Sequence, residues 1–407
     1  MPIRMLLSYA YLFLTISLSG LEFKLGIENI PNSFVNTYVH QNLKIGLVTN
    51  QTGKDRNGNR SVDILLKKGF KISYIFAPEH GLNGTIAAEK EVKDGIDVKT
   101  KIPVISLYAK DTGKKINPEI LQNIDALFFD IQDSGMRHYT YISTLYHVLK
   151  GAAQEKKRVV VFDRPNPLGK AMEGPLVDPS LISFISIAPI PLRHGMTVGE
   201  LAEYFNDLVL EQKASLQVIA MDGYERHNSF ESLLAPLSPN IACTASCHGY
   251  SFLGLLGEIK PFDVGVGTPL AFQLIALPES LAISSDVWQQ LALQLKGVGI
   301  HTTPHRYMHA LKKEYYHGLQ LQISNINQVA AFNAFLTTVT TIKKAGIDLR
   351  FNVNFDKAVG SKLVRLFLTD MASYQQLIEE VNNGLQYFFQ KAQTVFKYLP
   401  HPELIFN

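Results

Sequence analysis

The sequence predicts an α/β protein with a parallel-sheet domain first and a smaller α+β domain after it. From residue 44 onward, short apolar runs of β type alternate with amphipathic stretches, which is the pattern of βα units in a parallel sheet. Past about residue 260 the pattern changes to longer helical stretches with fewer clear strands. A length of 407 residues also exceeds the usual size of one hydrophobic core. We therefore place two domains, at residues 21–255 and 256–407.

The first half supplies short, bounded strand candidates with helix candidates between and after them. The expected strands are Lys44–Thr49, Ile72–Phe76, Val104–Leu107, Ala126–Phe129 and Val159–Phe162. The expected helices are Ser61–Lys68, Pro118–Asn123, Tyr141–Lys150 and Val198–Glu211, with Ser61 and Thr197 as N-cap candidates. In the second half the helical patterns are Asp286–Lys296, Val329–Lys344 and Tyr374–Ala392.

The charge balance argues against a nucleic-acid partner. Lys and Arg number 39 against 36 Asp and Glu, and hydrophobic residues make up 46% of the chain. This near balance creates no basic field of the kind that binds a phosphate backbone. A small polar substrate is the expected partner.

The first twenty residues have the layout of a signal peptide. Met1–Arg4 carry a positive charge, Met5–Leu18 are almost wholly apolar, and small residues follow at Ser19 and Gly20. The apolar run of 14 residues is short against the ~20 that a spanning helix needs, so a membrane anchor is the weaker interpretation. We expect residues 1–20 to be removed on export, which leaves a periplasmic or extracellular protein without a stable membrane span.

Cysteines and histidines give no convincing metal site. Cys243 and Cys247 are too few for a disulfide-built scaffold, and with His248 they offer three ligands in no common zinc spacing. Two buried thiols or one local disulfide are expected there. Three histidines stand four apart between residues 301 and 309, but a proline among them would interrupt a shared helix. No metal or other cofactor is expected.

Polar residues follow the strand candidates at the edge where parallel strands end. They are Asn50 and Gln51, Pro78–Gly81, Tyr108, Asp130–Asp133 and Asp163–Asn166. Ligands of open parallel sheets bind outside these carboxyl ends. Surface loops are polar too, so the composition carries more weight than the position. Carboxylate, amide, Arg and Tyr groups are the directional donors and acceptors that sugar hydroxyls need.

These groups include the pair of carboxylates that glycoside hydrolysis requires. One carboxyl protonates the leaving oxygen, and a second group stabilises or attacks the anomeric carbon. Glu79 and the pair Asp130 and Asp133 supply both types from adjacent strand ends, with Asp133 further out. Structural roles remain open: Glu79 as a helix cap, Asp130 as an anchor of loop amides, and His80 as a packed loop histidine. Arg137 is spaced either to pair with Asp133 or to bind a substrate carboxylate in bidentate fashion.

Motifs of competing functions are missing. The run Thr49–Gly53 lacks the glycines of a phosphate-binding loop, and Gly265–Gly267 is an isolated Gly-x-Gly of the kind that marks turns. No Gly-x-Ser-x-Gly elbow occurs, which removes the common serine hydrolase interpretation.

Several sequence blocks carry a resemblance to a known family. The blocks are Phe76–Gly81, Phe129–Ile142, Asp163–Gly169, Glu173–Pro175 and Arg193–Glu200. Together they are similar to the signature blocks of the exo-acting β-N-acetylmuramidases. The resemblance covers Lys44–Asn240 well and the rest of the chain thinly.

The resemblance implies a Rossmann-like domain joined to a smaller domain, with a cleft between them. There, terminal N-acetylmuramic acid would be released from peptidoglycan fragments, in cell-wall turnover and recycling. The resemblance implies Glu79 as the catalytic acid and places Asp133 at the sugar site, where we expect it to be the second catalytic residue. The expected substrate contacts are Asn50, His80, Asp130, Gln132, Arg137, Tyr139, Tyr141, Arg164, Asn166 and His194. We expect Glu79, Asp133, Arg137 and Arg164 to converge because they share strand-end positions.

After residue 240 the chain departs from the family pattern. Where the family has runs of Glu-Gly-Thr-Asn, Gly-Arg-Gly-Thr and Arg-Pro-Phe-Glu, this chain has Glu258–Pro261, Gly265–Thr268 and Leu270–Gln273. An arginine, an asparagine and a carboxylate are therefore missing. If those groups hold the lactyl carboxylate or the acetamido group, the protein acts slowly, prefers a different amino sugar, or only binds muropeptides without cleaving them.

Overall fold

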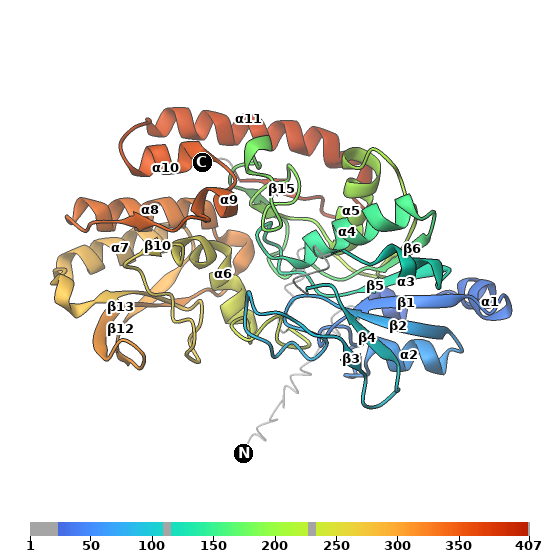
Figure 1. The fold of residues 1–407 in the computed structure, drawn as a ribbon. Coiled ribbons are helices and arrows are strands. Elements are labelled where there is room, and N and C mark those ends of the chain that lie inside the picture. The colour runs from blue at the N-terminus through green and yellow to red at the C-terminus, as the bar shows by residue number, and fades with distance from the viewer. Residues whose placement is uncertain (1–22, 109–114, 227–232, 406–407) are drawn as a thin grey trace, which may run out of the picture.

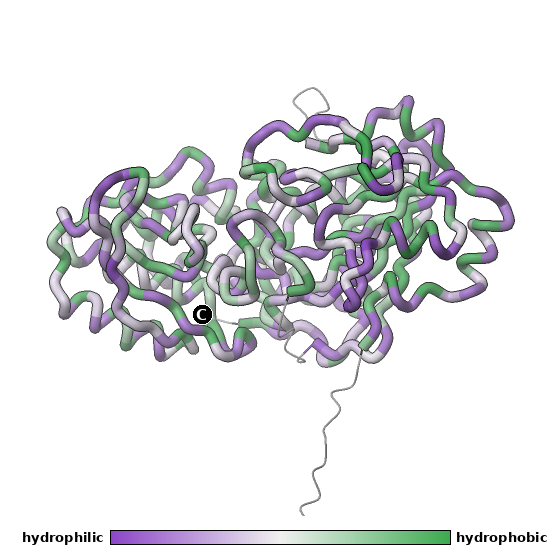
Figure 2. Tube along the Cα trace, turned by 90° about the horizontal axis from the view of Figure 1, so that it is seen from below, coloured by the Kyte–Doolittle hydropathy of each residue, from purple (hydrophilic) through white to green (hydrophobic). Residues whose placement is uncertain are grey.

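The computed structural model describes residues 23–108, 115–226 and 233–405, which form two lobes side by side (Figures 1 and 2). The expected signal peptide, residues 1–20, lies outside the described residues. Among the helices of the described ranges, none is long and apolar enough to cross a membrane.

The first lobe is built on a seven-stranded sheet of order β3-β4-β2-β1-β5-β6-β9. Six of these strands run parallel, and β3 at one edge pairs antiparallel with β4. The bounds are β1 Lys44–Thr49, β2 Lys71–Ala77, β3 Gly95–Ile96, β4 Pro103–Ser106, β5 Ala126–Asp130, β6 Arg158–Phe162 and β9 Ser215–Ile219. The predicted parallel-sheet fold is confirmed, and each of the five predicted strands is present within one residue of its expected bounds.

Both faces of the sheet are buried, which is why its strands read as continuous apolar runs. In β1, Leu47 packs in one core while Val48 packs in the other. Helices α1 (Asn32–His40) and α2 (Ser61–Lys67) cover the first of these faces. Helices α3 (Pro118–Gln122), α4 (Tyr141–Gln154) and α5 (Val198–Tyr204) cover the second. The expected helix Val198–Glu211 begins with the predicted Thr197 cap but ends in a short π-helix, Phe205–Val209.

The second lobe combines helices with small antiparallel sheets, of which the largest has the order β11-β13-β12. Its strands are β10 Ile259–Lys260, β11 Leu274–Pro278, β12 His301–His309, β13 Glu314–Gln322 and β14 Arg350–Phe351. Its helices are α6 Thr244–Leu256, α7 Ser285–Gly297, α8 Ala331–Lys344, α9 Phe355–Val359, α10 Lys362–Leu368 and α11 Tyr374–Ala392. The three long helices expected in this half are present.

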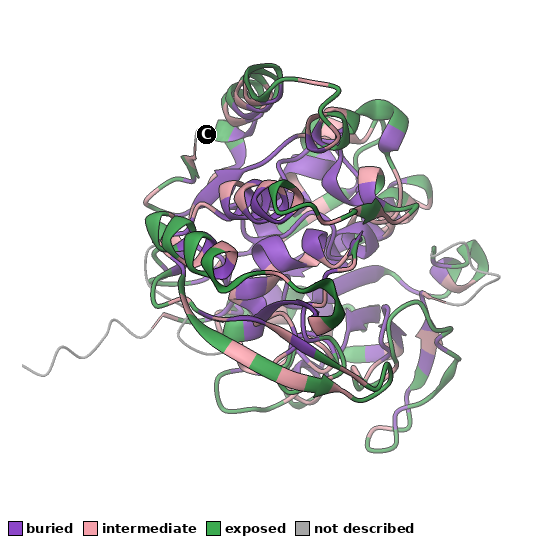
Figure 3. Ribbon diagram, turned by 90° about the vertical axis from the view of Figure 1, so that its left-hand side faces the viewer, coloured by how far each residue is buried: buried purple, intermediate pink, exposed green. Residues whose placement is uncertain are grey.

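The three evenly spaced histidines lie on the edge strand β12 and not on a helix. Residues of β12 alternate between exposed and half-buried, and the strand pairs with β13 along its whole length (Figure 3). A four-residue spacing therefore places these side chains on one face of a strand.

The segment after α11 packs on the first lobe. Strand β15 (Glu403–Leu404) pairs parallel with β7 (Ala171–Glu173), which pairs antiparallel with β8 (Arg193–His194). The hydroxyl of Tyr398 donates to the buried carboxylate of Asp163 at 2.7 Å. The predicted range 256–407 thus leaves out most of α6, which belongs to the second lobe, and includes a segment that packs on the first.

The two cysteines are free. Cys247 is buried in α6, where its thiol lies 3.7 Å from the carbonyl oxygen of Ser134, whereas Cys243 is exposed. The expectation of two buried thiols is therefore wrong for Cys243. In the part of the chain that the structure describes, no group of three or more His, Cys, Asp or Glu side chains is arranged to hold a metal ion.

Candidate active site

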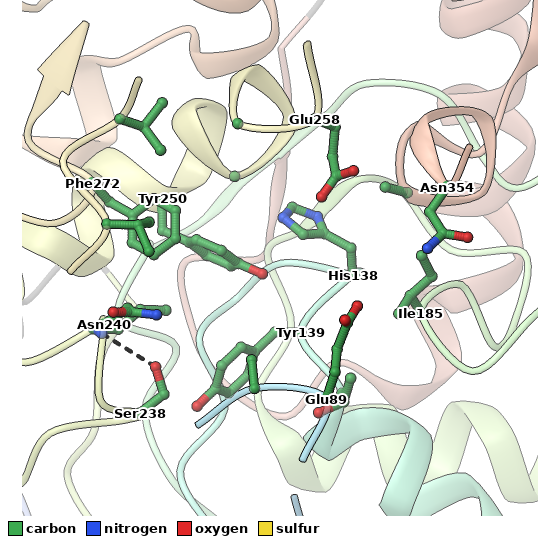
Figure 4. Close-up of a pocket in the computed structure, with 18 of the residues that line it drawn as sticks. Glu89, His138, Tyr139, Ile185, Ser238, Asn240, Tyr250, Glu258, Phe272 and Asn354 are labelled. Carbon is green, nitrogen blue, oxygen red and sulfur yellow. Dashed lines mark hydrogen bonds between the residues drawn. The ribbon is translucent and has the colours of Figure 1, made fainter. Parts of the chain in front are cut away.

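A pocket of about 720 Å³ lies between the lobes, within the size range of small-molecule sites (Figure 4). Its first wall comes from the loops after β2, β4 and β5, which carry Glu79, Tyr108 and Tyr139. Its second wall comes from α6, the segment after it, and α9, and includes Tyr250 and Glu258. The pocket therefore opens at the carboxyl ends of the parallel strands, where an open α/β sheet places its ligands.

Glu79 is the carboxylate that β2 delivers into this pocket. It is only 5% exposed, and its Oε2 accepts a hydrogen bond from the Thr140 hydroxyl at 2.7 Å. Its Oε1 accepts from the backbone N–H of Glu89 at 3.0 Å. Burial is the main reason why the pKa of the neighbouring Tyr108 is raised. The negative charge of Glu79 and a hydrogen bond between Tyr108 and Glu79 raise this pKa further. Tyr108 thus stays protonated, and Glu79 is fixed in position by several donors.

A tight turn after β2 sets the direction of Glu79. His80 and Gly81 have left-handed backbone conformations, with φ of 68° and 77°, and the Gly81 N–H donates to the Pro78 carbonyl at 3.0 Å. A non-glycine residue pays a conformational cost at such a φ. The Nδ1 atom of His80 lies 2.7 Å from the carbonyl oxygen of Ile86. Because a carbonyl only accepts, Nδ1 carries the proton of a neutral His80.

Aromatic rings form a connected surface in the pocket. The Tyr250 ring centroid lies 6.0 Å from that of Tyr139, 4.9 Å from that of Phe272 and 4.8 Å from that of His138. Burial raises the pKa of Tyr250, and nearby carboxylate charges, with Glu79 foremost, add to this shift. The surface is therefore neutral, and it offers flat apolar faces against which a sugar ring can pack.

The second wall brings charged groups of both signs. The Glu258 carboxylate lines the pocket, and its Oε2 accepts from the side-chain N–H of Asn352 at 3.1 Å. Lys260 and Lys357 also line the pocket and are exposed. Neither lysine forms an ion pair with another residue of the described ranges. Both are therefore available to bind an anionic group of a ligand.

The three runs that depart from the family pattern all reach this wall. Glu258 and Lys260 come from the first run, Val266 from the second and Phe272 from the third. Val266 stands between the two glycines, where the family pattern has an arginine. The positive charge on this wall therefore comes from lysines at other positions.

Of the expected site residues, Glu79, His80 and Tyr139 line the pocket. Asp133 and His194 instead form a buried pair behind its first wall. Asp133 Oδ2 accepts from the Gly135 N–H at 2.7 Å and lies 3.0 Å from His194 Nε2. Because the Met196 N–H donates to Nδ1 of His194, Nε2 carries the proton and donates to Asp133. Asp133 thus shapes the loop after β5 and does not project outward as expected.

The two expected arginines are buried, and their donors are directed at the protein itself. Arg164 forms a bidentate pair with Asp130, at 2.6 and 2.7 Å. The Arg137 guanidinium donates to the backbone carbonyls of Pro175, Ile190 and Val359, at 2.6 to 2.8 Å. Burial lowers the pKa of Arg137 to about 9.

Other strand-end residues also make internal contacts. Asn50 Oδ1 accepts from the Thr52 N–H at 2.9 Å, and the Gln132 side chain donates to two backbone carbonyls. Asn166 donates to the Met196 carbonyl at 3.0 Å, and the Tyr141 hydroxyl to that of Leu237 at 3.2 Å. The structure therefore does not bring Glu79, Asp133, Arg137 and Arg164 into one site. Short polar side chains at the strand ends are used first to satisfy loop amides and carbonyls.

Sequence reasoning also missed several pocket residues. Thr140 and His138 lie inside a recognised block, and their position beside Tyr139 was an available signal. Tyr250 and Glu258 come from a segment more than a hundred residues later, where a short pattern gives no signal of proximity.

The fold and the pocket define a Rossmann-like α/β protein with a carboxylate- and aromatic-lined cleft of the glycosidase type. Residues 45–245 match the family model described as exo-beta-N-acetylmuramidase NamZ, N-terminal, and residues 248–398 match the corresponding C-terminal model. The chain belongs to the exo-β-N-acetylmuramidase family.

A named relative agrees with this assignment, and two solved structures share the fold. The chain is 36% identical to the peptidoglycan beta-N-acetylmuramidase NamZ of Bacillus subtilis strain 168, over 88% of this chain and 86% of that protein. A crystal structure of a DUF1343 family protein from Bacteroides fragilis is 29% identical, with a TM-score of 0.78, and covers 93% of this chain and 99% of that one. A second such protein from the same organism, 24% identical with a TM-score of 0.71 and the same coverage, shares the fold.

Proposed function

We propose that the protein hydrolyses the β-glycosidic bond of a terminal N-acetylmuramic acid and releases that sugar from peptidoglycan fragments. The family and the name of the Bacillus subtilis relative support this activity. The observation that carries the proposal is the position of Glu79, a carboxyl held by Thr140 and Glu89 in a pocket with an aromatic surface. A role in cell-wall turnover and recycling follows from the substrate.

In this proposal Glu79 is the general acid that donates a proton to the leaving oxygen. Its contacts with Thr140 and the Glu89 amide hold it in place for that transfer. Glu258, on the second wall, is the proposed carboxylate that stabilises positive charge at the anomeric carbon. This assignment moves the second role from Asp133 to Glu258, because Asp133 does not line the pocket and is hydrogen-bonded to His194.

Lys260 and Lys357 are the proposed partners of the lactyl carboxylate. They are the lysines that line the pocket, and no ion pair with another described residue occupies either of them. A lysine binds a carboxylate as a flexible point charge, whereas an arginine would fix it in bidentate fashion. Binding of the lactyl group at this wall is therefore expected to be electrostatic and sensitive to salt.

A hydrolase for a different amino sugar is the second candidate function. The observation that favours it is the second wall, where Val266, 45% exposed, lines the pocket at the position of the family's arginine. The relative turnover of substrates that end in N-acetylmuramic acid and in N-acetylglucosamine distinguishes the two candidates.

We also propose that the protein is exported. The charged, apolar and small-residue order of residues 1–20 supports this localisation. Amino-terminal sequencing of the protein recovered from the periplasm or the medium tests it. A mature chain that begins at Met1 or Pro2 would exclude cleavage.

The activity itself is tested with muropeptides that end in β-linked N-acetylmuramic acid. Mass spectrometry of the products is expected to show free N-acetylmuramic acid and a fragment shortened by that one sugar. Intact fragments that bind to the protein without being cleaved would refute the hydrolase proposal and support a noncatalytic muropeptide-binding protein.

A further inference from the structure

Asn240 presents to the pocket a side-chain amide that the protein itself does not use. It lines the pocket and is half-buried. Among the described residues, neither its Oδ1 nor its Nδ2 has a hydrogen-bond partner, and neither atom is fully buried. Such an amide can donate and accept without giving up a bond within the protein, so it indicates a ligand with a matching polar group.

The turn that carries Asn240 is held by its other residues. The Ile241 N–H donates to the carbonyl oxygen and to the hydroxyl of Ser238, both at 3.2 Å, and the Leu237 N–H donates to the Ile241 carbonyl at 2.9 Å. Pro239 occupies the position at which proline favours a turn. The Asn240 side chain is not needed to close this turn, which leaves its amide available for recognition.

Two tyrosines join this turn to the residue proposed as the acid. The carbonyl oxygen of Leu237 accepts from the hydroxyls of Tyr139 at 2.7 Å and of Tyr141 at 3.2 Å. The Tyr141 hydroxyl also lies 3.5 Å from the backbone carbonyl oxygen of Glu79. These contacts fix the turn of Asn240 on the side of the pocket that holds Glu79.

We propose that Asn240 determines specificity by binding the acetamido group of the sugar whose glycosidic oxygen Glu79 protonates. This inference rests on the proposed function. The acetamido group stands on the carbon next to the anomeric carbon, so its binding site must lie close to the acid. The lactyl carboxylate, by contrast, is assigned to Lys260 and Lys357 on the second wall.

The neighbourhood of Asn240 fits an acetamido group better than a hydroxyl group. Its Nδ2 donates to the acetamide carbonyl, and this bond fixes the orientation of the planar amide. The rings of Tyr250 and Phe272, whose centroids are 4.9 Å apart, lie on the same side of the pocket as Asn240 (Figure 4). They provide an apolar surface for the acetamide methyl group. A hydroxyl group would take the hydrogen bond but leave this surface uncovered.

The test compares two 4-nitrophenyl glycosides that differ at one position. One is the β-N-acetylmuraminide, and the other has a hydroxyl group in place of the acetamido group. The ratio of their kcat/KM values is measured for the wild type, Asn240→Leu and Asn240→Gln. The Leu variant has nearly the same size but no polar atoms, whereas the Gln variant restores the amide one methylene further out. Asn354→Leu, which removes an exposed amide on the opposite side of the pocket, is the matched control (Figure 4).

We expect Asn240→Leu to lower the preference for the acetamido substrate by about tenfold, which corresponds to about 1.4 kcal/mol. Asn240→Gln recovers part of this preference, and Asn354→Leu leaves it unchanged. A purely structural role would lower both kcat/KM values by the same factor. An unchanged ratio in Asn240→Leu, or an equal loss of preference in Asn354→Leu, overturns the inference. Should Asn240→Leu fail to fold in a thermal melt, the same ratio is measured with Asn240→Ala.

Calorimetry with free N-acetylmuramic acid and its 2-hydroxyl analogue separates this inference from the proposed function. A wild type that neither cleaves the glycosides nor binds the sugar refutes the proposed function, and the inference with it. A wild type that prefers the acetamido ligand while Asn240→Leu retains the full preference refutes the role of Asn240 alone.

Discussion

Replacement of Glu79 by Gln tests the proposed acid with little change in shape. Glu79 accepts hydrogen bonds from the Thr140 hydroxyl and from the backbone N–H of Glu89, and it also shares a hydrogen bond with Tyr108. A Gln at this position keeps its oxygen on the backbone N–H and turns its NH₂ toward Thr140, whose hydroxyl rotates to accept. The exchange conserves the bonds to Thr140 and Glu89, so we expect the free energy of unfolding to change by less than about 1 kcal/mol.

The rate effect should depend on the leaving group. A positioned general acid contributes ~10²–10⁴ in rate, and an alcohol leaving group needs that proton far more than a nitrophenol does. We therefore expect Glu79→Gln to lose at least about 100-fold on a natural muropeptide and far less on the 4-nitrophenyl N-acetylmuraminide. Steady-state kcat values on both substrates provide the measurement.

Glu89→Gln is the matched control for Glu79→Gln. Glu89 also lines the pocket, but it holds Glu79 through its backbone N–H, which the substitution preserves. The loss of kcat in Glu89→Gln should therefore be small and equal on the two substrates. Equal losses for Glu79→Gln on both substrates would show that Glu79 is not the acid, and undiminished activity would remove it from the mechanism.

Three further predictions follow from the charges and burial of single residues. Lys260→Met and Lys357→Met should each weaken binding of N-acetylmuramic acid by about two- to fivefold at low salt, and calorimetry should show no such loss with N-acetylglucosamine, which lacks the lactyl carboxylate. Arg137→Met leaves three buried carbonyls without donors and should lower the free energy of unfolding by roughly 3–5 kcal/mol in urea denaturation. As a control at an exposed position, Arg350→Met should change the free energy of unfolding by less than about 0.5 kcal/mol. His138 has its pKa lowered to about 3 in the folded protein, so below pH ~6.5 only the unfolded chain takes up its proton and wild-type stability falls. His138→Phe removes this pH dependence. The free energy of unfolding of the variant, relative to that of the wild type, should therefore rise by about 2 kcal/mol as the pH is lowered from 7 to 5. A difference that stays constant over this range would contradict the low pKa.

The parallel sheet could be predicted because its strands are buried on both faces. Runs such as Val159–Phe162 are continuously apolar, so they can be recognised as strands without knowing which elements pack on either face. Strands β3 and β9 were missed because β3 has only two residues and β9 alternates between exposed and half-buried positions. Strand β12 was not predicted for a similar reason, since it is an edge strand without a fully buried position.

The site could be predicted only where it follows the sheet. Glu79 and His80 were found because a strand-end position in a parallel sheet fixes the edge at which a residue appears, whereas Tyr139 was found through the resemblance of its block to the family. That rule does not give the direction of a side chain. Asp133 and Arg164 have the same type of position as Glu79, yet their nearest partners are His194 and Asp130, and both turn inward.

The two walls of the pocket differ in how their residues are stabilised, and this difference explains which wall carries the acid and which carries the departures from the family pattern. The first wall belongs to loops that buried ion pairs and backbone contacts hold rigid, as Arg137 does when it joins carbonyls from both halves of the chain. A residue within such a network cannot change without leaving a buried group unpaired, so this wall is suited to carry the acid. The second wall presents Lys260, at the end of strand β10, and Val266, in the loop after it, as exposed side chains, where a substitution costs little stability. The departures from the family pattern fall on that wall, which is where a change of sugar preference can arise while the position of Glu79 stays fixed.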